Sequence, residues 1–422
     1  WQLIVASTPP PPFSASALDV DSVINDGRIT AHLQKGLLDA SGRWAGLCPF
    51  CNGIDVSNSP ALDSFLYANK VNPAYWQDVN QVEQFGFLKT QVQPFHLVTP
   101  DNETLYGWHL LPLHLCHEHE KELTENPPSG PAADYEQTSA FKILANDPNA
   151  RVVVSFHGNA AHLGSAQRPA TYNTLLGLSN PSHPVHVFAI DYRGFGVSTG
   201  SPTEEGVITD GVSLLNFLTA GPLKIPTSRI VIMGQSLGTA VTAAVAERFA
   251  FGHPDPNAVQ PAIKNAEPFA GASPSPMLSP LIGYPRFQKW IMSHIVDYWD
   301  TAARVARLTG VNPSSEFDHL HKDLDLTIVH AQNDIEIPWR EGRRVWTAAT
   351  GEDIKGAPGA VVYTKSEAIS PSQVEIWENK ITAKDGSQVV KKVRWERVRY
   401  GGHNRVASFS VAGIAVLRSF EE

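Results

Sequence analysis

A serine flanked by glycines, set between an apolar run and a run of small residues, constrains this chain more than any other feature. Residues 230–233 read Ile-Val-Ile-Met, which predicts a strand buried on both faces. Gly-Gln-Ser-Leu-Gly follows at 234–238, and residues 239–245 have the small side chains of a closely packed helix. Strand, tight turn and helix are the setting in which G-x-S-x-G presents its serine as a nucleophile, because the glycines let strand and helix approach closely. We therefore expect the hydroxyl of Ser236 at the carboxyl end of a central strand.

The composition is that of an ordinary globular protein. The 422 residues are 42% hydrophobic and 18% charged, which excludes a disordered chain and allows one large core or two domains. The formal net charge of −9, without a long Lys or Arg run, argues against a nucleic-acid partner. No apolar run is long enough to span a bilayer, so the sequence predicts no membrane-spanning helix.

The three cysteines do not favour a metal site. Cys48 and Cys51 form a C-x-x-C pair, and Cys116 lies far along the chain beside His117 and His119. A lone C-x-x-C with distant further ligands is weak evidence for zinc. A local disulfide or two free thiols is the favoured interpretation, and no metal is expected.

The chain divides into two parts of different character. Residues 1–90 combine scattered turn residues with many aromatics, which predicts an irregular extension packed on the main domain. A hairpin is expected over 91–111, with turn residues at 100–102. From 151 onward strands and helices alternate, the pattern of a parallel sheet with crossover helices. The main domain is therefore expected to cover 91–422.

The alternating region predicts a definite series of elements. Strands are expected at 151–156, 185–190, 263–269, 324–330 and 393–400, and helices at 166–178, from 201, at 340–349 and over 406–417. The stretch 113–148 is polar and rich in loop markers, and 350–393 is polar and irregular, with room for an extra hairpin.

An insertion at 271–323 interrupts the alternation. It opens with prolines, and Tyr284 and Phe287 then begin a series at helical spacing, with Trp290 alongside. A core helix has the same spacing, but the position outside the repeating unit favours a cap over the site. We expect Tyr284, Phe287 and Trp290 to bind substrate there.

Three residues far apart in sequence have the order of a nucleophile, an acid and a base. A serine hydroxyl attacks only when a base removes its proton and a third group orients that base. Ser236, Asp334 and His403 each follow an expected strand, in the order serine, acid, histidine. Asp323 and Asp325 precede the same strand that Asp334 follows, so they are expected at its other end.

The negative charge that develops during such an attack needs hydrogen-bond donors already in place. We expect the backbone N–H of Leu237 and one from the loop at 157–159, assigned to Asn159, to form this oxyanion hole. His157 is expected to support that loop rather than to transfer protons. His330 belongs to a strand and is expected to be an interior histidine.

Five motifs carry a resemblance to a known family. They are HGN at 157–159, DYRGFGVSTGSPTEEG at 191–206, GQSLG at 234–238, HAQNDIEIPW at 330–339 and YGGHN at 400–404. Together they resemble the α/β-hydrolase superfamily, and within it the membrane-associated lysophospholipid and monoacylglycerol lipases and their fungal relatives. The resemblance covers 91–422. It implies an α/β-hydrolase fold: a mostly parallel central sheet, helices on both faces and a helical cap insertion.

The same resemblance implies a hydrolase of esters or thioesters with a hydrophobic acyl pocket and no cofactor. One departure concerns the pocket wall, where those relatives carry Ala-Pro-Phe and this chain has Glu267 in the sequence Asn-Ala-Glu-Pro-Phe at 265–269.

We expect a serine hydrolase that cleaves a lipid-like carboxylic ester through an acyl-enzyme on Ser236, at a membrane surface or aggregate. An acyl-protein thioesterase or an esterase for small esters is the alternative among enzymes. A catalytically inactive hydrolase-fold binding protein is the alternative of another class, and the intact set of serine, acid and histidine disfavours it.

The cellular route is suggested by two features. The chain begins at Trp1 with the apolar run WQLIVAS, and Asn102-Glu103-Thr104 is an N-x-T acceptor at the expected hairpin turn. Both indicate the secretory pathway or membrane association, with a cytoplasmic protein as the alternative.

Overall fold

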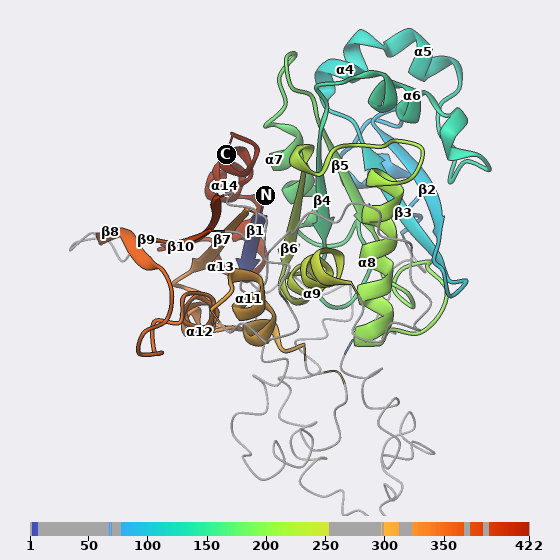
Figure 1. Ribbon diagram of the computed structural model, residues 1–422. Helices are drawn as coiled ribbons and strands as arrows, with labels where there is room; N and C mark the ends of the chain where they lie inside the picture. The colour runs from blue at the N-terminus through green and yellow to red at the C-terminus, as the bar shows by residue number, and fades with distance from the viewer. Residues whose placement is uncertain are drawn as a thin grey trace, which may run out of the picture.

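A ten-stranded sheet forms the centre of the protein (Figure 1). The computed structural model describes residues 2–6, 67, 69, 77–252, 297, 299–311, 323–366, 372–382 and 388–421. The strand order is β2-β3-β5-β4-β6-β1-β7-β10-β9-β8. The six strands from β5 to β10 in this order pair in parallel, and the two strands beyond each end are antiparallel. The expected mostly parallel sheet is therefore confirmed.

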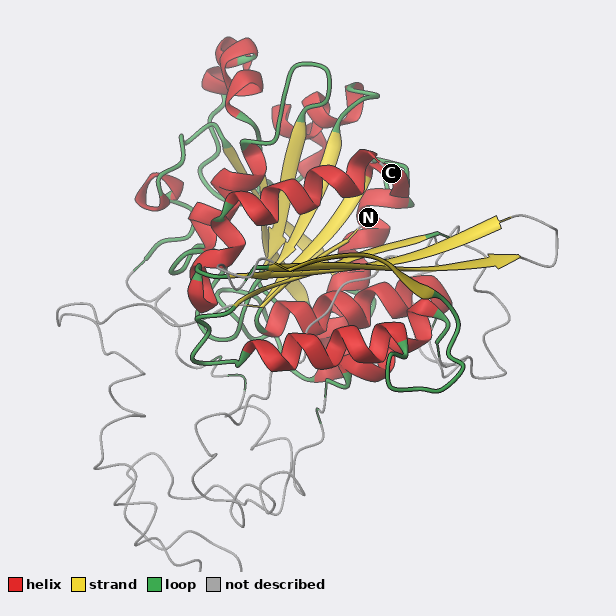
Figure 2. Cartoon of the chain, turned by 90° about the vertical axis from the view of Figure 1, so that its left-hand side faces the viewer, coloured by secondary structure: helices red, strands yellow, loops and turns green. Residues whose placement is uncertain are grey.

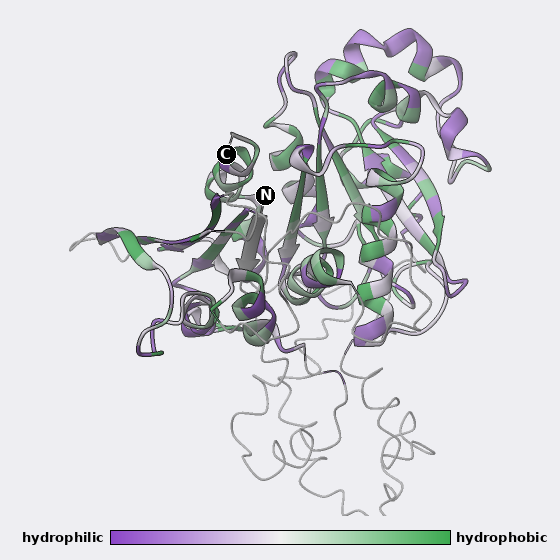
Figure 3. Ribbon diagram, viewed as in Figure 1, coloured by the Kyte–Doolittle hydropathy of each residue, from purple (hydrophilic) through white to green (hydrophobic). Residues whose placement is uncertain are grey.

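The strands follow the apolar runs of the sequence. They are β1 (Gln2–Ala6), β2 (Val92–Val98), β3 (Thr104–Leu110), β4 (Arg151–Phe156), β5 (Val185–Ile190), β6 (Ile230–Gln235), β7 (Leu324–Ala331), β8 (Ala360–Ser366), β9 (Gln373–Thr382) and β10 (Gln388–Val398). Residues of β5 and β7 are buried along the whole strand, as expected for parallel strands covered on both faces. The central strands are accordingly among the most hydrophobic parts of the chain (Figure 3).

Helices cover both faces of the sheet (Figure 2). They are α4 (Leu113–Glu118), α5 (Glu120–Glu125), α6 (Ser139–Asn146), α7 (Arg168–Leu176), α8 (Glu204–Thr219), α9 (Leu237–Phe251), α11 (Thr301–Thr309), α12 (Trp339–Thr350), α13 (Gly402–Arg405) and α14 (Ser410–Glu421). One core cluster includes residues of α8, α9, α11 and α12. A second cluster includes residues of α7 and α14, so two helical layers enclose the sheet.

Strand β1 was not among the elements expected from the sequence. It lies between β6 and β7 and pairs in parallel with both, for example Ile4 with Gly234 and with Ile328. The interpretation of 1–90 as an irregular extension did not include a strand inside the sheet. The strand expected at 263–269 lies outside the described residues, as does Glu267.

Two stretches that are polar in sequence contain regular structure, and only the first of them was unexpected. The stretch 113–148, interpreted as a loop, forms α4, α5 and α6, and these helices bury a small cluster that includes Leu115, Leu123 and Ile143. The apolar residues that form this cluster are spaced too widely along the chain to give a clear helical period in the sequence. The stretch before the last strand holds β8 and β9, whose antiparallel pairing confirms the extra hairpin expected there, and β10 begins at Gln388, earlier than expected.

The described end of the expected cap is part of the layered domain. Within 271–323, helix α11 packs between α9 and α12, and its Val305 and Leu308 are fully buried in the main core. The apolar face of α11 packs in the core beneath the sheet. This part of 271–323 therefore does not form a cap over the site. Tyr284, Phe287 and Trp290 lie outside the described residues.

Candidate active site

Ser236 occupies a strained turn between β6 and α9. Its φ of 55° and ψ of −121° are rarely adopted by a residue with a side chain. A Cβ on Gly234 would lie 2.0 Å from the carbonyl oxygen of Gly238, and a Cβ on Gly238 would lie 2.0 Å from that of Phe156. Both glycines are therefore required for the turn. The arrangement is the strand–turn–helix geometry that the sequence predicted.

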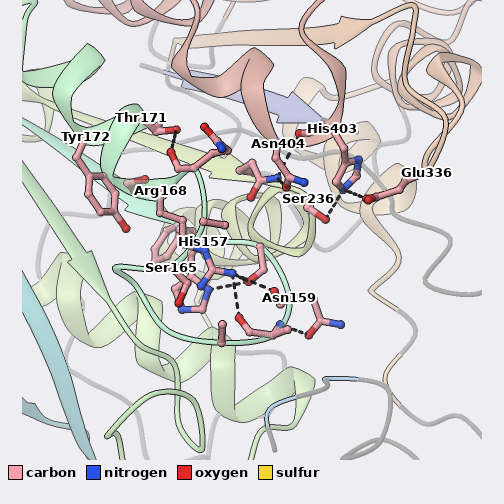
Figure 4. A pocket seen from close by; sticks show the side chains of 18 residues that line it. His157, Asn159, Ser165, Arg168, Thr171, Tyr172, Ser236, Glu336, His403 and Asn404 are labelled. Carbon is pink, nitrogen blue, oxygen red and sulfur yellow. Dashed lines mark hydrogen bonds and ion pairs between the residues drawn. The ribbon is translucent and has the colours of Figure 1, made fainter. Parts of the chain in front are cut away.

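The structure brings Ser236, His403 and Asp334 into one hydrogen-bonded chain. Figure 4 shows the first link of this chain, from Ser236 to His403. Nε2 of His403 is 2.9 Å from Oγ of Ser236, and Nδ1 is 3.2 Å from Oδ2 of Asp334. An ionised carboxylate only accepts hydrogen bonds, so Nδ1–H of the imidazole donates to Asp334. That tautomer leaves the lone pair of Nε2 directed at the serine hydroxyl, which is the arrangement that a general base needs.

Asp334 is held by several further groups. It follows β7, its side chain has no exposed surface, and Oδ1 accepts the backbone N–H of Ile337. Nε2 of the buried His330 lies 3.3 Å from Oδ2 and 3.0 Å from the carbonyl of Ile337. His330 is thus an interior histidine as expected, but it also contacts the acid. These contacts fix the carboxylate in the orientation that faces His403.

Burial controls the charge of both groups. It raises the pKa of Asp334 to about 6, against the opposing effect of His330, and it lowers the pKa of His403 well below its ordinary value. At neutral pH the acid is therefore ionised and the imidazole is neutral. A neutral imidazole can accept the serine proton.

The two residues expected to form an oxyanion hole lie beside Ser236. Leu237 begins α9, where the first N–H groups of a helix have no intrahelical partner. Asn159 lines the same cavity as Ser236, in the loop that follows β4. A Cβ built on its neighbour Gly158 would lie 3.2 Å from Cβ of Ser236, so this loop contacts the turn closely. His157 is buried with Nδ1 2.7 Å from the carbonyl of Gly158, consistent with a supporting role.

Two residues of the site were not found from the sequence. Oε2 of Glu336 lies 3.2 Å from Nε2 of His403, and its side chain is 37% exposed. It stands two residues after Asp334 in the same loop, a signal that could have indicated it. The other is Arg168, ten residues after Gly158, whose contacts depend on the folded loop and leave no local pattern.

A cavity of about 300 Å³ adjoins the serine (Figure 4). Its lining surface is more apolar than polar, and the polar residues in it include Asn159, Arg168, Thr171, Gln235, Glu336 and Asn404. The amide of Gln235 donates to Oδ1 of Asn404 at 3.2 Å, which joins the turn to the histidine loop. The cavity therefore offers both hydrogen-bonding groups and apolar surface next to the serine.

The competing residues lie elsewhere. Asp323 accepts the backbone N–H of Val390, and Asp325 contacts Ser419, both at the start of β7. Cys116 is a buried free thiol, and Cys48 and Cys51 lie outside the described residues. Among the residues that the structure describes, no group of three His, Cys, Asp or Glu side chains could hold a metal ion.

Two observations bear on the expected cellular route. Asn102 is exposed in the turn between β2 and β3, so the acceptor is accessible, and its glycosylation stays a prediction. No helix in the described parts of the chain combines the length and apolar character needed to cross a bilayer.

Comparison with known proteins identifies the family. A model of the Alpha/beta hydrolase family matches residues 152–408, and the chain belongs to this family. It is 24% identical over 323 residues to lysophosphatidylserine lipase ABHD12 of Rattus norvegicus. This alignment covers 75% of this chain and 70% of that protein. The protein of the same name from Danio rerio is 25% identical over 307 residues, 72% of this chain and 70% of that one.

Among solved structures, an alpha-beta hydrolase from Vibrio vulnificus aligns with a TM-score of 0.48 at 15% identity, covering 89% of this chain and 95% of that one. The family match confirms the expected fold and superfamily. The chain is therefore an α/β hydrolase, and its relatives of substantial coverage are named as lipases.

Proposed function

We propose that this protein is a serine hydrolase that cleaves a carboxylic ester of a lipid through an acyl-enzyme on Ser236. The observation that carries the proposal is the hydrogen-bonded chain from Oγ of Ser236 through the imidazole of His403 to Asp334, at 2.9 and 3.2 Å. Each member has the environment that its role requires: a strained turn that lines the cavity, a neutral buried base and an ionised buried acid.

The first half of the reaction forms the acyl-enzyme. Oγ of Ser236 attacks the ester carbonyl carbon while its proton moves to Nε2 of His403. The resulting oxyanion accepts hydrogen bonds from the N–H groups of Leu237 and Asn159. The carbon–oxygen bond of the ester then breaks, and His403 gives its proton to the leaving alcohol. Asp334 stabilises the imidazolium throughout and keeps its own charge.

The second half releases the acid. A water molecule attacks the acyl carbon, gives one proton to His403 and forms a second oxyanion in the same position. Breakdown of this intermediate returns the proton to Oγ of Ser236 and frees the carboxylic acid. The balance needs only ester and water, so no cofactor enters the reaction.

Two observations favour a lipid ester with a polar head group. The relatives with substantial coverage are named as lysophosphatidylserine lipases. The cavity beside Ser236 includes polar side chains, among them Asn159, Thr171 and Asn404, that can hydrogen-bond a glycerol or phosphoglycerol leaving group. The acyl chain would then bind on another side of the serine, where we continue to expect Tyr284, Phe287 and Trp290.

Fluorophosphonate labelling followed by an ester panel tests the proposal. We expect Ser236 to be labelled in the wild type and not in Ser236→Ala. The value of kcat/KM should rise with acyl length, because each buried methylene contributes about 0.8 kcal/mol. A preference for acetate or butyrate esters would favour a small-ester esterase, and a preference for acyl-thioesters would favour a thioesterase. An unlabelled wild type would indicate an inactive binding protein.

A further inference from the structure

Arg168 makes an unusual set of contacts next to the serine. Nη2 donates to the carbonyl oxygens of Gly158, Asn159 and Ala160 at 3.0, 2.9 and 2.9 Å, and Nη1 donates to the carbonyl of His162 (Figure 4). No carboxylate forms a salt bridge with it among the described residues. One guanidinium therefore binds four carbonyl groups within residues 158–162 of the loop between β4 and α7.

The position of Arg168 is electrostatically unfavourable for a positive charge. It is the first residue of α7, where the partial positive charge of the helix end disfavours a cation. Burial also lowers its pKa, which means that the charged form is poorly solvated. A half-buried cation at a helix start has to be stabilised by other groups. The loop carbonyls supply that stabilisation.

The loop itself is strained where the guanidinium binds it. Ala160 and Ala161 have φ of 60° and 57°, a left-handed conformation that is unfavourable for residues with a side chain. Such strain persists only where surrounding contacts determine the backbone, and the bonds from Arg168 to Asn159 and Ala160 do so.

The direction of the carbonyls fixes the direction of the amides. In a trans peptide the N–H points away from the C=O of the same unit. The carbonyls of Gly158 and Asn159 face Arg168, so the N–H groups of Asn159 and Ala160 point to the opposite side of the loop. The same loop contacts Ser236 through Gly158, and it was expected to supply an oxyanion donor.

We infer that Arg168 is a positioning residue that holds the loop after β4 with its amide donor aimed at the oxyanion. The inference rests on the proposed function, because it gives a role to the loop only if Ser236 acts as a nucleophile. The guanidinium touches carbonyls of the loop and acts through them. Its charge also polarises those peptide units, which strengthens their N–H groups as donors.

Replacement of Arg168 tests the inference against a matched control. Arg168→Met should lower kcat by about 10- to 100-fold, since small misplacements of catalytic groups have effects of this size, and should change KM by less than about twofold. Arg168→Lys should recover only part of kcat, because one ammonium cannot reproduce the fork of a guanidinium. Both variants should stay folded by near-UV circular dichroism.

Arg229 provides the control. Its Nη1 also donates to three backbone carbonyls, those of Asp147, Pro148 and Ala150, but at the opposite end of the sheet. Arg229→Met should lower the free energy of unfolding and leave kcat within about twofold, because it is far from the reacting atoms. A loss of kcat in both variants would mean that general loosening is responsible, and would overturn the inference.

Two readouts separate positioning from other roles. A trifluoromethyl ketone forms an alkoxide on Ser236, so its affinity should fall in Arg168→Met by the same factor as kcat/KM. In Arg168→Ala, tens of millimolar guanidinium, far below the molar range that unfolds proteins, should restore part of kcat.

An unchanged inhibitor affinity would contradict the inference. So would a rise in KM for phosphate-bearing esters at constant kcat, since that pattern marks a residue that binds the substrate anion. If the wild type is labelled by fluorophosphonate and hydrolyses esters while both Arg168 variants match it, only the inference on Arg168 fails. If the wild type is not labelled, the proposed function itself fails.

Discussion

The two ends of strands β4 and β6 use the same device for different purposes. At the amino end, Arg229 donates to loop carbonyls at 147–150 and stabilises the connection that leads into β4. At the carboxyl end, Arg168 donates to the carbonyls of the loop that leaves β4. The first loop belongs to the structural base of the sheet. The second lies beside Ser236.

Backbone strain is more frequent at the carboxyl end. Ser236, Ala160 and Ala161 have positive φ there, against Lys224 before β6 at the amino end, and Asp334 is buried there with a raised pKa. Asp323, at the amino end of β7, makes an ordinary hydrogen bond to a backbone N–H. Strained residues that surround one side chain, here Ser236, indicate where the structure serves catalysis rather than stability. Substitutions at the two ends should therefore differ in what they change.

The largest effect is expected from the base and the nucleophile. His403→Ala and Ser236→Ala should each lower kcat by about a millionfold, and the double variant should lose little more, because the members act as a unit. Steady-state hydrolysis of one lipid ester measures all three. Additive losses in the double variant would show that the two residues do not share one step.

The acid is the next test, with a carboxylate at the other end of β7 as its control. Asp334→Asn should lower kcat by about 10⁴-fold, because the amide stabilises the wrong tautomer of His403. Asp325→Asn should lower it by less than about tenfold, since it lies at the start of the strand. A larger loss of kcat in Asp325→Asn than in Asp334→Asn would mean that the acid is Asp325, at the other end of the sheet.

The variant Asp334→Asn should lose activity without losing stability. Its pKa is raised in the folded state, so the protein loses stability as pH rises through the range from about 4 to about 6 and the acid ionises. Asp334→Asn removes this loss at neutral pH, and its Tm should be no lower than that of the wild type. A clear drop in Tm would mean that the carboxylate stabilises the fold.

The smallest effect concerns the pH profile. Activity needs ionised Asp334 and neutral His403, so kcat/KM should fall as pH drops through about 6. Oε2 of Glu336 lies 3.2 Å from Nε2 of His403, and its negative charge favours the protonated forms of both His403 and Asp334. Glu336→Gln should therefore shift the acid limb to lower pH, by less than about one unit because the side chain is partly exposed. A shift to higher pH would contradict this placement of charge.

The sequence was most informative where local pattern and chemistry coincide. The turn at Ser236 was predictable because strand, glycines and helix are contiguous, and Asp334 and His403 because each follows an apolar strand in a fixed order. Arg168 was not, because its partners are backbone carbonyls, which every residue carries. Its role depends on a loop conformation that only the folded chain defines.

Long-range pairing also left no signal in the sequence. Strand β1 pairs with β6 and β7, which are far away along the chain, and an apolar run as short as that of residues 3–6 gives no indication of its neighbours. Helices α4, α5 and α6 were missed for a related reason. Their few apolar residues become recognisable as a core only when the helices pack together.

Trapping of the acyl-enzyme is the most direct test of the central claim. The wild type is mixed with a lipid ester, quenched in acid within milliseconds to seconds, and digested for mass spectrometry. The account predicts an acyl group on the peptide that contains Ser236, accumulating in Arg168→Met more slowly than in the wild type and absent from Ser236→Ala. Turnover of the ester without an adduct on Ser236, retained in Ser236→Ala, would contradict it.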